Sequence, residues 1–173
     1  MAAAGNETHD IQHNRNLILV PCETGVLSCI SATGAMDLPA EYTNYGTNAI
    51  NNAAPGGDVT QRQPYPTGAI YSLCTTRSVY PQLAACRTAE GGAPSLGVGY
   101  VWAQGTRAAA PHISGLGAYL DSQFGGALNG SQILTQVQQH ADDLGKPGAD
   151  PYYGKGRMNT CRTLPGCVPI ENP

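Results

Sequence analysis

Residues 105–115 read GTRAAAPHISG, a stretch in which a glycine turn leads directly into a predicted helix. Apolar side chains recur along one face of this helix at the spacing of 3.6 residues per turn, namely Ile113, Leu116, Leu120 and Phe124. Arg107 lies in the first turn, where the positive end of the helix dipole disfavours a cation by about 0.3–1 kcal/mol at an exposed site. Local stability therefore does not explain Arg107, which becomes a candidate functional residue.

The segments around this helix predict an α/β plan. A second helix is expected to start at Ser131 as the N-cap and to end at Gly145, with Leu134, Val137, Ala141 and Leu144 on one face. Short apolar runs between turn residues predict strands at 17–20, 29–32, 49–54 and 100–103. Residues 57–99 are rich in Gly, Pro, Thr and Ser, so we expect a loop insertion pinned by cysteines, with a hairpin around 69–73. Gly115 and Gly117 are predicted to let the first helix pack closely.

The composition predicts one globular domain over residues 1–173. The chain is 41% hydrophobic and 12% charged, with a formal net charge of −3, so it offers no basic surface for nucleic acid or for an anionic membrane. No apolar run reaches the roughly 18–20 residues that cross a bilayer. Met1 is not followed by a basic region, so no signal peptide is expected in this chain.

Six cysteines fall as three local couples, which predicts the disulfides Cys22–Cys29, Cys74–Cys86 and Cys161–Cys167. A zinc site is the alternative reading, which the absence of a Cys-x-x-Cys pair disfavours. Disulfides indicate an oxidising compartment, whereas no export signal is visible, so we expect the chain to be part of a longer gene product.

The 105–115 stretch, together with several other segments of the chain, resembles the C-terminal half of a subtilisin-like serine protease domain. In that family a Gly-Thr-Ser-Met-Ala segment carries the nucleophilic serine at the start of a long helix, and here Gly105-Thr106-Arg107-Ala108-Ala109 matches it with arginine at the serine position. Residues 2–7, AAAGNE, resemble the strand end that carries the oxyanion-hole asparagine, which is Asn6. Further matches follow in the family's order: residues 20–21, 30–34, 42–46, 53–57, 141–145 and 153–157.

The resemblance implies a doubly wound, mostly parallel sheet with flanking helices and a slot for a substrate side chain. The small residues that would line the slot are Ala3, Ala4, Gly5, Ala54 and Gly56. Close packing between strands is the other reading of these residues. The second oxyanion donor would be the backbone N–H of residue 107, which survives the change of side chain.

Metal ligands are not assignable from the sequence. His9 and His13 lie four residues apart, but no apolar helical period supports a shared helix face between them. Asp121, Asp142 and Asp143 are read as solvated helix residues. Proteases of this family often hold calcium, and no ligand set for it can be named here; no other cofactor is expected.

Function follows from the same resemblance. The family's catalytic aspartate and histidine belong to its N-terminal half, which these motifs do not include, and an arginine guanidinium stays protonated with no lone pair to attack a carbonyl. We therefore expect a fragment of a secreted subtilisin-like endopeptidase that is inactive as this chain. Its partners would be the missing N-terminal half of the domain and the peptide or protein substrate of the intact domain. The alternative is a non-catalytic protease homologue that binds peptides or proteins.

Overall fold

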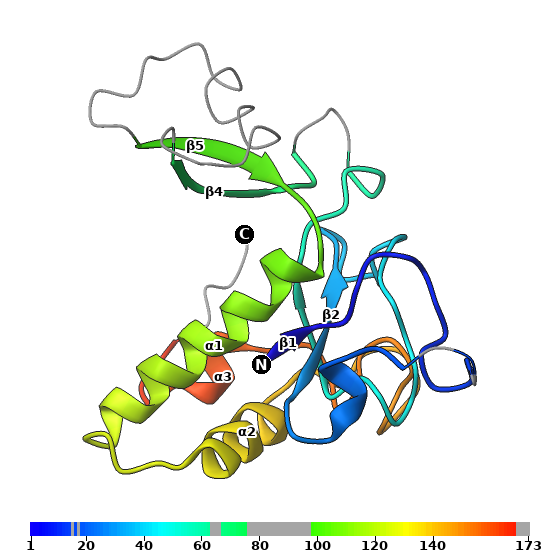
Figure 1. Cartoon of the computed structure of the whole chain (residues 1–173). Coiled ribbons are helices and arrows are strands. Elements are labelled where there is room, and N and C mark those ends of the chain that lie inside the picture. The colour runs from blue at the N-terminus through cyan, green and yellow to red at the C-terminus, as the bar shows by residue number, and fades with distance from the viewer. Residues whose placement is uncertain (15, 17, 63–66, 76–97, 169–173) are drawn as a thin grey trace.

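The computed structural model describes residues 1–14, 16, 18–62, 67–75 and 98–168. A parallel sheet forms its centre, with the strand order β1 (Ala2–Ala3), β2 (Cys29–Thr33) and β3 (Asn52–Pro55). Every residue of β2 is buried, as expected for the middle strand of a parallel sheet covered by other elements. The register pairs Ala3 with Ile30 and Ala32 with Ala54 (Figure 1).

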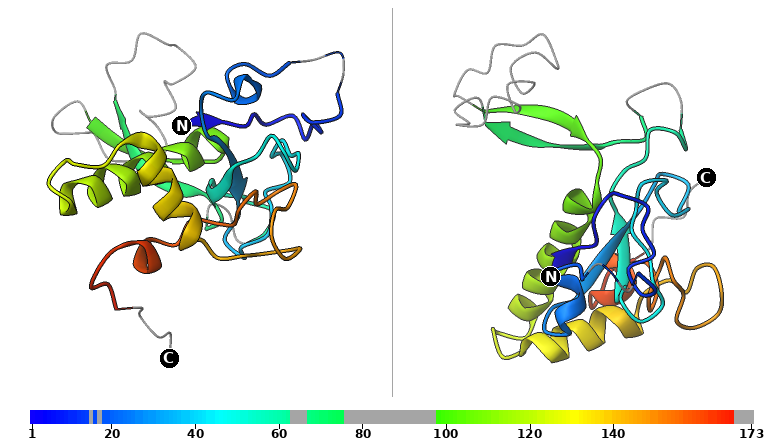
Figure 2. Two further views of the ribbon diagram at one scale, coloured as in Figure 1. Left: turned by 90° about the horizontal axis from the view of Figure 1, so that it is seen from below. Right: turned by 45° about the vertical axis from the view of Figure 1, so that its right-hand side comes forward.

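Helix α1 (Thr106–Gln123) lies along one face of this sheet, as both views of Figure 2 show. Its buried face presents Ala109, Ile113 and Leu116 to the core that includes Ile30 and Ala54. The predicted helix and most of its apolar face are therefore confirmed. Phe124 is an exception, because the helix ends before it and its side chain is 49% exposed.

The two glycines of α1 differ in their surroundings. A methyl group on Gly117 would come within 2.8 Å of Cγ2 of Ile133, so this glycine lets α1 and the next helix approach closely. A methyl group on Gly115 would meet nothing within 4 Å, so the packing role predicted for Gly115 is wrong.

Helix α2 (Gly130–Gln139) is shorter than predicted. Its N-cap is Asn129, whose side chain accepts from the backbone of Gln132 while the Gln132 side chain accepts from the backbone N–H of Asn129. This reciprocal capping box fixes the start two residues before Ser131. The helix ends before Ala141 because the chain turns there and Asp142 exchanges backbone hydrogen bonds with Arg157.

A two-stranded antiparallel ribbon is formed by β4 (Ile70–Thr75) and β5 (Val98–Ala103). The strand predicted at 100–103 is confirmed, whereas residues 70–75 form a single strand that pairs with this distant segment, so the hairpin predicted around 69–73 is wrong. In Figure 1 and the right panel of Figure 2, the ribbon stands beyond the N-terminal end of α1, away from the central sheet. Tyr71 packs against Tyr100 and Trp102 across the ribbon, with ring centroids 5.1 and 4.5 Å apart.

The other strand predictions had mixed outcomes. The strand at 29–32 is confirmed by β2, and the one at 49–54 is realised only from Asn52 onward. The described residues Ile18–Val20 form no strand, because the chain turns there into the 3₁₀ helix η1 (Cys22–Thr24). The Leu19 backbone N–H bonds to the carboxylate of Glu23 instead of to a neighbouring strand.

The C-terminal part of the described chain returns to the sheet. The backbone of Ala53 donates to the Gly156 carbonyl at 3.1 Å and accepts from Met158 at 2.9 Å, so this segment lies beside β3. A short helix, α3 (Thr160–Thr163), follows. Asp142 is not simply solvated, since it accepts from the guanidinium of Arg157 at 2.9 Å and from that of Arg162 at 3.2 Å.

Two of the predicted disulfides are confirmed, Cys22–Cys29 and Cys161–Cys167. The third, Cys74–Cys86, lies outside the described residues because Cys86 is not among them. Within the part of the chain that the structure describes, no helix has both the length and the apolar character needed to cross a membrane.

Candidate active site

The candidate site forms where the end of β1 meets the start of α1. Thr106, which is fully buried, accepts a hydrogen bond from the backbone N–H of Gly5 at 3.1 Å through its hydroxyl oxygen. The same hydroxyl donates to Oδ1 of Asn6 at 2.9 Å, and the backbone N–H of Thr106 donates to that oxygen at 2.9 Å. The hydroxyl and the backbone N–H of Thr106 therefore hold the Asn6 side chain against the first turn of α1, directly before Arg107.

Glycine at position 5 is required by the backbone and by its neighbour. Its φ is +99°, a conformation that favours glycine, and a methyl group there would come within 2.3 Å of Nδ2 of Asn44. Asn44 is buried and bonds to three backbone groups in the segment that follows β1. Its Nδ2 donates to the Ala4 carbonyl at 2.8 Å, and its Oδ1 accepts from the backbone N–H of Glu7 at 3.1 Å and from that of His9 at 2.8 Å. The strand end is thus held on both sides.

Glu7 adds a carboxylate to this region. One carboxylate oxygen, Oε2, accepts from the backbone N–H of Asn6 at 2.9 Å and from Nδ2 of Asn44 at 2.8 Å. These contacts tie the acid to the loop that carries Asn6. Sequence reasoning did not single out Glu7 or Thr106, although each is the immediate neighbour of a residue that it did.

A cavity of about 440 Å³ opens beside this junction. Its lining residues come from the end of β1, from the loop before η1 and from the first turn of α1: Met1, Ala2, Ala3, Gly5, Asn6, Glu7, Leu19, Val20, Pro21, Thr106 and Arg107. Asn6 and Arg107 thus share one cavity, as do Ala3 and Gly5. The predicted slot residues Ala4, Ala54 and Gly56 do not line it.

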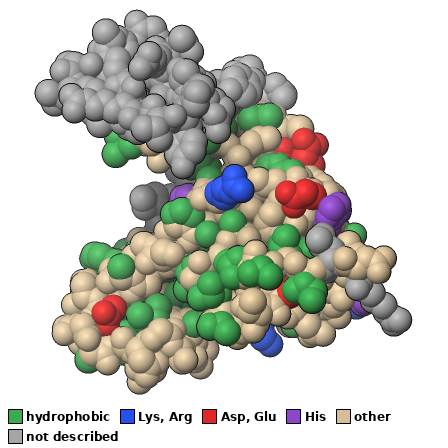
Figure 3. Space-filling view, viewed as in Figure 1, with side chains coloured by type: hydrophobic (Ala, Val, Ile, Leu, Met, Phe, Trp, Pro, Cys, Tyr) green, Lys and Arg blue, Asp and Glu red, His purple; other side chains and the backbone are tan. Residues whose placement is uncertain are grey.

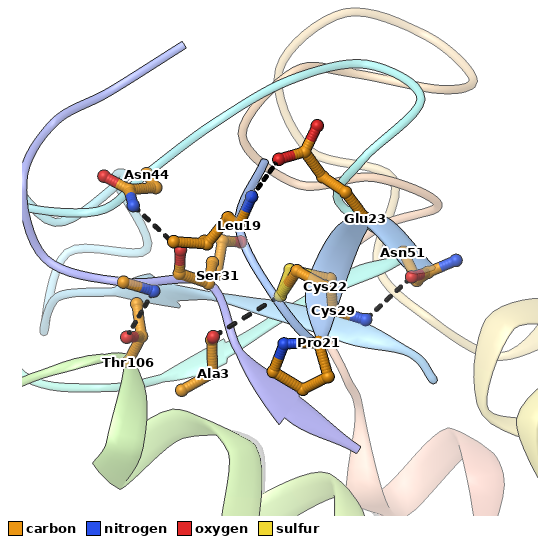
Figure 4. The surroundings of a disulfide bond; sticks show 12 residues. Ala3, Leu19, Pro21, Cys22, Glu23, Cys29, Ser31, Asn44, Asn51 and Thr106 are labelled. Carbon is orange, nitrogen blue, oxygen red and sulfur yellow. Dashed lines mark hydrogen bonds between the residues drawn. A yellow bond between two sulfur atoms is a disulfide. The ribbon is translucent and has the colours of Figure 1, made fainter. Parts of the chain in front are cut away.

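The loop of residues 19–21 forms a wall of the cavity that the sequence analysis missed. Figure 4 shows the Cys22–Cys29 disulfide tying this loop to the start of β2, next to Ala3 and Pro21. Sγ of Cys22 lies 3.4 Å from the Ala3 carbonyl oxygen, which brings the loop against β1. A signal was present in the sequence, because the predicted disulfide begins one residue after Pro21.

Ala54 and Gly56 lie beneath the glycine turn instead. Ala54 is fully buried in β3, and the carbonyl of Gly56 accepts from the backbone N–H of Gly105 at 2.9 Å. A methyl group on Gly56 would clash with Ala32 at 2.5 Å, so close packing is the role that the contacts of Gly56 support. The hydroxyl of Tyr42 also donates to the Gly56 carbonyl, and burial raises the pKa of Tyr42.

Histidines and acids near the site have other partners. Nδ1 of His112 bonds to the Ala108 carbonyl within α1 at 2.8 Å. His13 pairs with Asp10 at 2.8 Å, a contact that holds the pKa of Asp10 below its ordinary value. Among the described residues, no group of three or more His, Cys, Asp or Glu side chains is arranged to hold a metal ion.

Comparison with known proteins gives a family match. The sequence model of the subtilase family matches residues 1–156. Subtilisin-like protease 6 of Arthroderma benhamiae is 28% identical over 161 residues, covering 90% of this chain and 29% of that protein. An extracellular serine protease of Serratia marcescens is 40% identical over 65 residues, which are 38% of this chain and 6% of that protein. The chain thus spans about 29% of the length of the fungal relative.

Solved structures show the same fold. A lanthipeptide protease superposes with a TM-score of 0.72 at 24% identity and covers 93% of this chain and 48% of its own. A protease of Pseudoalteromonas arctica gives a TM-score of 0.67 at 22% identity, covering 96% of this chain and 42% of its own. The α/β fold inferred from the sequence is therefore confirmed, and each solved chain is more than twice as long as the part that matches.

Proposed function

This chain belongs to the subtilase family, and we propose that it carries the oxyanion and nucleophile part of a subtilisin-like serine protease domain in a form that hydrolyses no peptide bond. The observation that carries the proposal is arginine at residue 107, in the first turn of α1 and beside Asn6. We assign Arg107 to the position of the family's nucleophilic serine. A guanidinium has no lone pair with which to attack a carbonyl carbon, so covalent catalysis cannot begin there.

A serine at this position would still need a base. The triad requires a histidine that takes the hydroxyl proton and a carboxylate that orients the histidine. The described residues that line the cavity include no histidine, and the bonded pair of His13 and Asp10 does not line it. We therefore propose that arginine at residue 107 and the lack of a histidine base among the described residues of the cavity act together to prevent hydrolysis.

The direct test is hydrolysis by the purified chain. Loss of the triad lowers the turnover of a subtilisin by about a millionfold, with roughly 10³–10⁴ over the uncatalysed rate left to the oxyanion hole and binding. We expect no release of product from peptide substrates above a mock purification. Turnover that an active-site serine reagent abolishes would contradict the proposal.

A repair experiment tests the residue assignments. Arg107→Ser alone should remain inactive, because a serine without a base is a poor nucleophile at neutral pH. The same variant fused behind the N-terminal half of a related protease should gain endopeptidase activity. Replacing Asn6 by leucine in that fusion should lower the rate about 10²–10³-fold if its amide stabilises the oxyanion. A folded but inert fusion, or one indifferent to Asn6, would overturn the assignment.

The edge of the sheet supports the half-domain as a partner. In the described sheet β1 is an outer strand and pairs only with β2. Exposed apolar side chains lie beside the N-terminal residues: Val20, 71% exposed, lines the cavity together with Ala2 and Ala3, and Val26, 83% exposed, lines another cavity together with Met1. We propose that the N-terminal half of a subtilase domain supplies a strand next to β1. The disulfides fit a parent protein that works outside the cell.

Peptide binding without cleavage is the second candidate. The cavity is formed by this chain's own residues, with both the Asn6 and Arg107 side chains at its wall. Binding of peptides in the absence of hydrolysis would favour this candidate over a merely incomplete protease, which we would expect to bind only after the other half is added.

A further inference from the structure

We infer that Arg107 turns the cavity into a receptor for the free C-terminal carboxylate of a peptide. This inference rests on the proposed function, since it takes the site to be non-catalytic and to bind peptides. It goes further by naming the chemical group that is recognised.

Two hydrogen-bond donors at the cavity have no acceptor among the residues that the structure describes. The Oδ1 atom of Asn6 accepts hydrogen bonds from the backbone N–H and from the hydroxyl of Thr106. These two bonds fix which end of the Asn6 amide is the oxygen, and they leave the Nδ2 group free to donate elsewhere. Within the described chain, no residue accepts from Nδ2 of Asn6 or from the backbone N–H of Arg107. Since Arg107 lies in the first turn of α1, its N–H has no partner inside the helix.

The guanidinium of Arg107 adds a full positive charge to these donors. Its side chain is exposed and makes no ion pair with any described residue. The neighbouring acid, Glu7, already accepts from Asn6 and Asn44 through Oε2. Figure 3 shows few basic side chains on the face seen there, with acidic side chains and histidines among them.

A carboxylate matches this set of donors better than an internal peptide group does. An uncleaved peptide carbonyl is neutral, whereas a carboxylate carries one full negative charge and two oxygens that fit the planar fork of arginine. The dipole of α1, which disfavours Arg107 alone, favours an anion bound at the same point. Binding the carboxylate therefore removes the electrostatic conflict created by a cation in the first helical turn.

The walls of the cavity point to a peptide as the source of the carboxylate. Ala3, Leu19 and Pro21 offer an apolar surface for the last side chain of a peptide, in a space of about 440 Å³. Glu7 at the same cavity opposes ligands with more than one negative charge, such as inorganic phosphate, and opposes an acidic last residue. A monoanionic peptide end with an apolar or basic last side chain satisfies both conditions.

The test uses the purified chain and matched peptides. Hexapeptides with each of several apolar, basic and acidic last residues are prepared with a free carboxylate and with a C-terminal amide, and their Kd values are measured by titration calorimetry. Charge-assisted hydrogen bonds of this kind correspond to about a tenfold or larger gain in affinity. We expect the carboxylate peptides to bind at least about tenfold more tightly than their amides, with a preference that weakens as salt is raised.

Variants assign the effect to Arg107. Arg107→Gln should remove most of the preference for the carboxylate, leaving only the part that the helix dipole and the N–H donors supply, while keeping the weaker binding of the amide peptides, which also shows that the cavity is still folded. Arg107→Lys should keep only part of the preference, because lysine lacks the bidentate fork. Lys146→Gln is the matched control, because it removes one exposed charge that does not line the cavity, and it should leave both affinities unchanged.

Two results would overturn the inference, and they are distinguishable. Equal binding of carboxylate and amide peptides, or an undiminished preference in Arg107→Gln, would refute carboxylate recognition by Arg107 and leave peptide binding standing. Failure of all peptides to bind would refute both carboxylate recognition and the peptide-binding function, without restoring any claim of hydrolysis, which the turnover assay decides separately.

Discussion

Thr106→Val is the sharpest test of how the site is held together. Valine has nearly the same shape as threonine, so the change mainly deletes the hydroxyl that accepts from Gly5 and donates to Asn6. The backbone N–H of Gly5 would then lose its acceptor, the hydroxyl oxygen of the fully buried Thr106, at a cost of about 1–3 kcal/mol. Asn6 is exposed and can turn to water, so its lost bond adds only about 0.5–1 kcal/mol. We expect a total loss of about 1.5–4 kcal/mol in the free energy of unfolding.

The matched control is Thr106→Ser, which keeps the hydroxyl and deletes only a methyl group, at about 1 kcal/mol. Both variants would be unfolded in urea and followed by far-ultraviolet circular dichroism, with the m-value compared to exclude a change in the denatured state. Equal destabilisation by valine and serine would refute the reasoning, because it would mean that the two hydrogen bonds contribute nothing and that Asn6 is positioned by other contacts.

Three further predictions concern the helices, the charges and the third disulfide. Gly115→Ala should stabilise α1 by about 0.5–1 kcal/mol. Gly117→Ala should leave the stability unchanged or lower it, because the added methyl group meets Ile133 of α2. Equal melting temperatures for the two variants would contradict this. Burial raises the pKa of Asp142, but hydrogen bonds from Arg157 and its neighbours outweigh it and hold the pKa below the ordinary value. The stability that Asp142 provides is therefore present above about pH 4 and is lost as the pH falls through the lowered pKa of the folded state. Asp142→Ala should lower the free energy of unfolding by about 1–3 kcal/mol at pH 7 and by progressively less in acid, as measured by urea unfolding at a series of pH values. Peptide mapping without reduction should recover a Cys74–Cys86 link, and free thiols at both positions would disprove it.

Local patterns explain what the sequence predicted about the fold. The apolar period of α1 is carried by Ile113, Leu116 and Leu120, whose burial depends on their own helix facing one sheet. The two observed disulfides close short loops, so proximity in sequence was a sufficient guide. The start of α2 was also locally encoded, although by Asn129 and Gln132 and not by the serine that was chosen.

Long-range contacts explain the errors. The apolar repeat continues past Gln139, but the helix stops because Asp142 pairs with Arg157, which is fifteen positions further along the chain. At the candidate site, Arg107 was singled out by its charge in the first turn of a helix and Asn6 by a family resemblance, and the structure brings both to one cavity. The wall formed by Leu19–Pro21 was missed because a disulfide and a strand from elsewhere in the chain position it.

The ribbon of β4 and β5 has a consequence for spectroscopy. It contains Trp102, the one tryptophan of the chain, whose ring packs against that of Tyr71 across the two strands with the centroids 4.5 Å apart. Because the ribbon's strands pack chiefly on each other, tryptophan emission reports on the ribbon, while the helical signal reports on α1 and α2. Tryptophan emission and helix content therefore follow different parts of the molecule. Because the first turn of α1 begins a few residues after Trp102, the fluorescence of this tryptophan can also report a ligand that binds there.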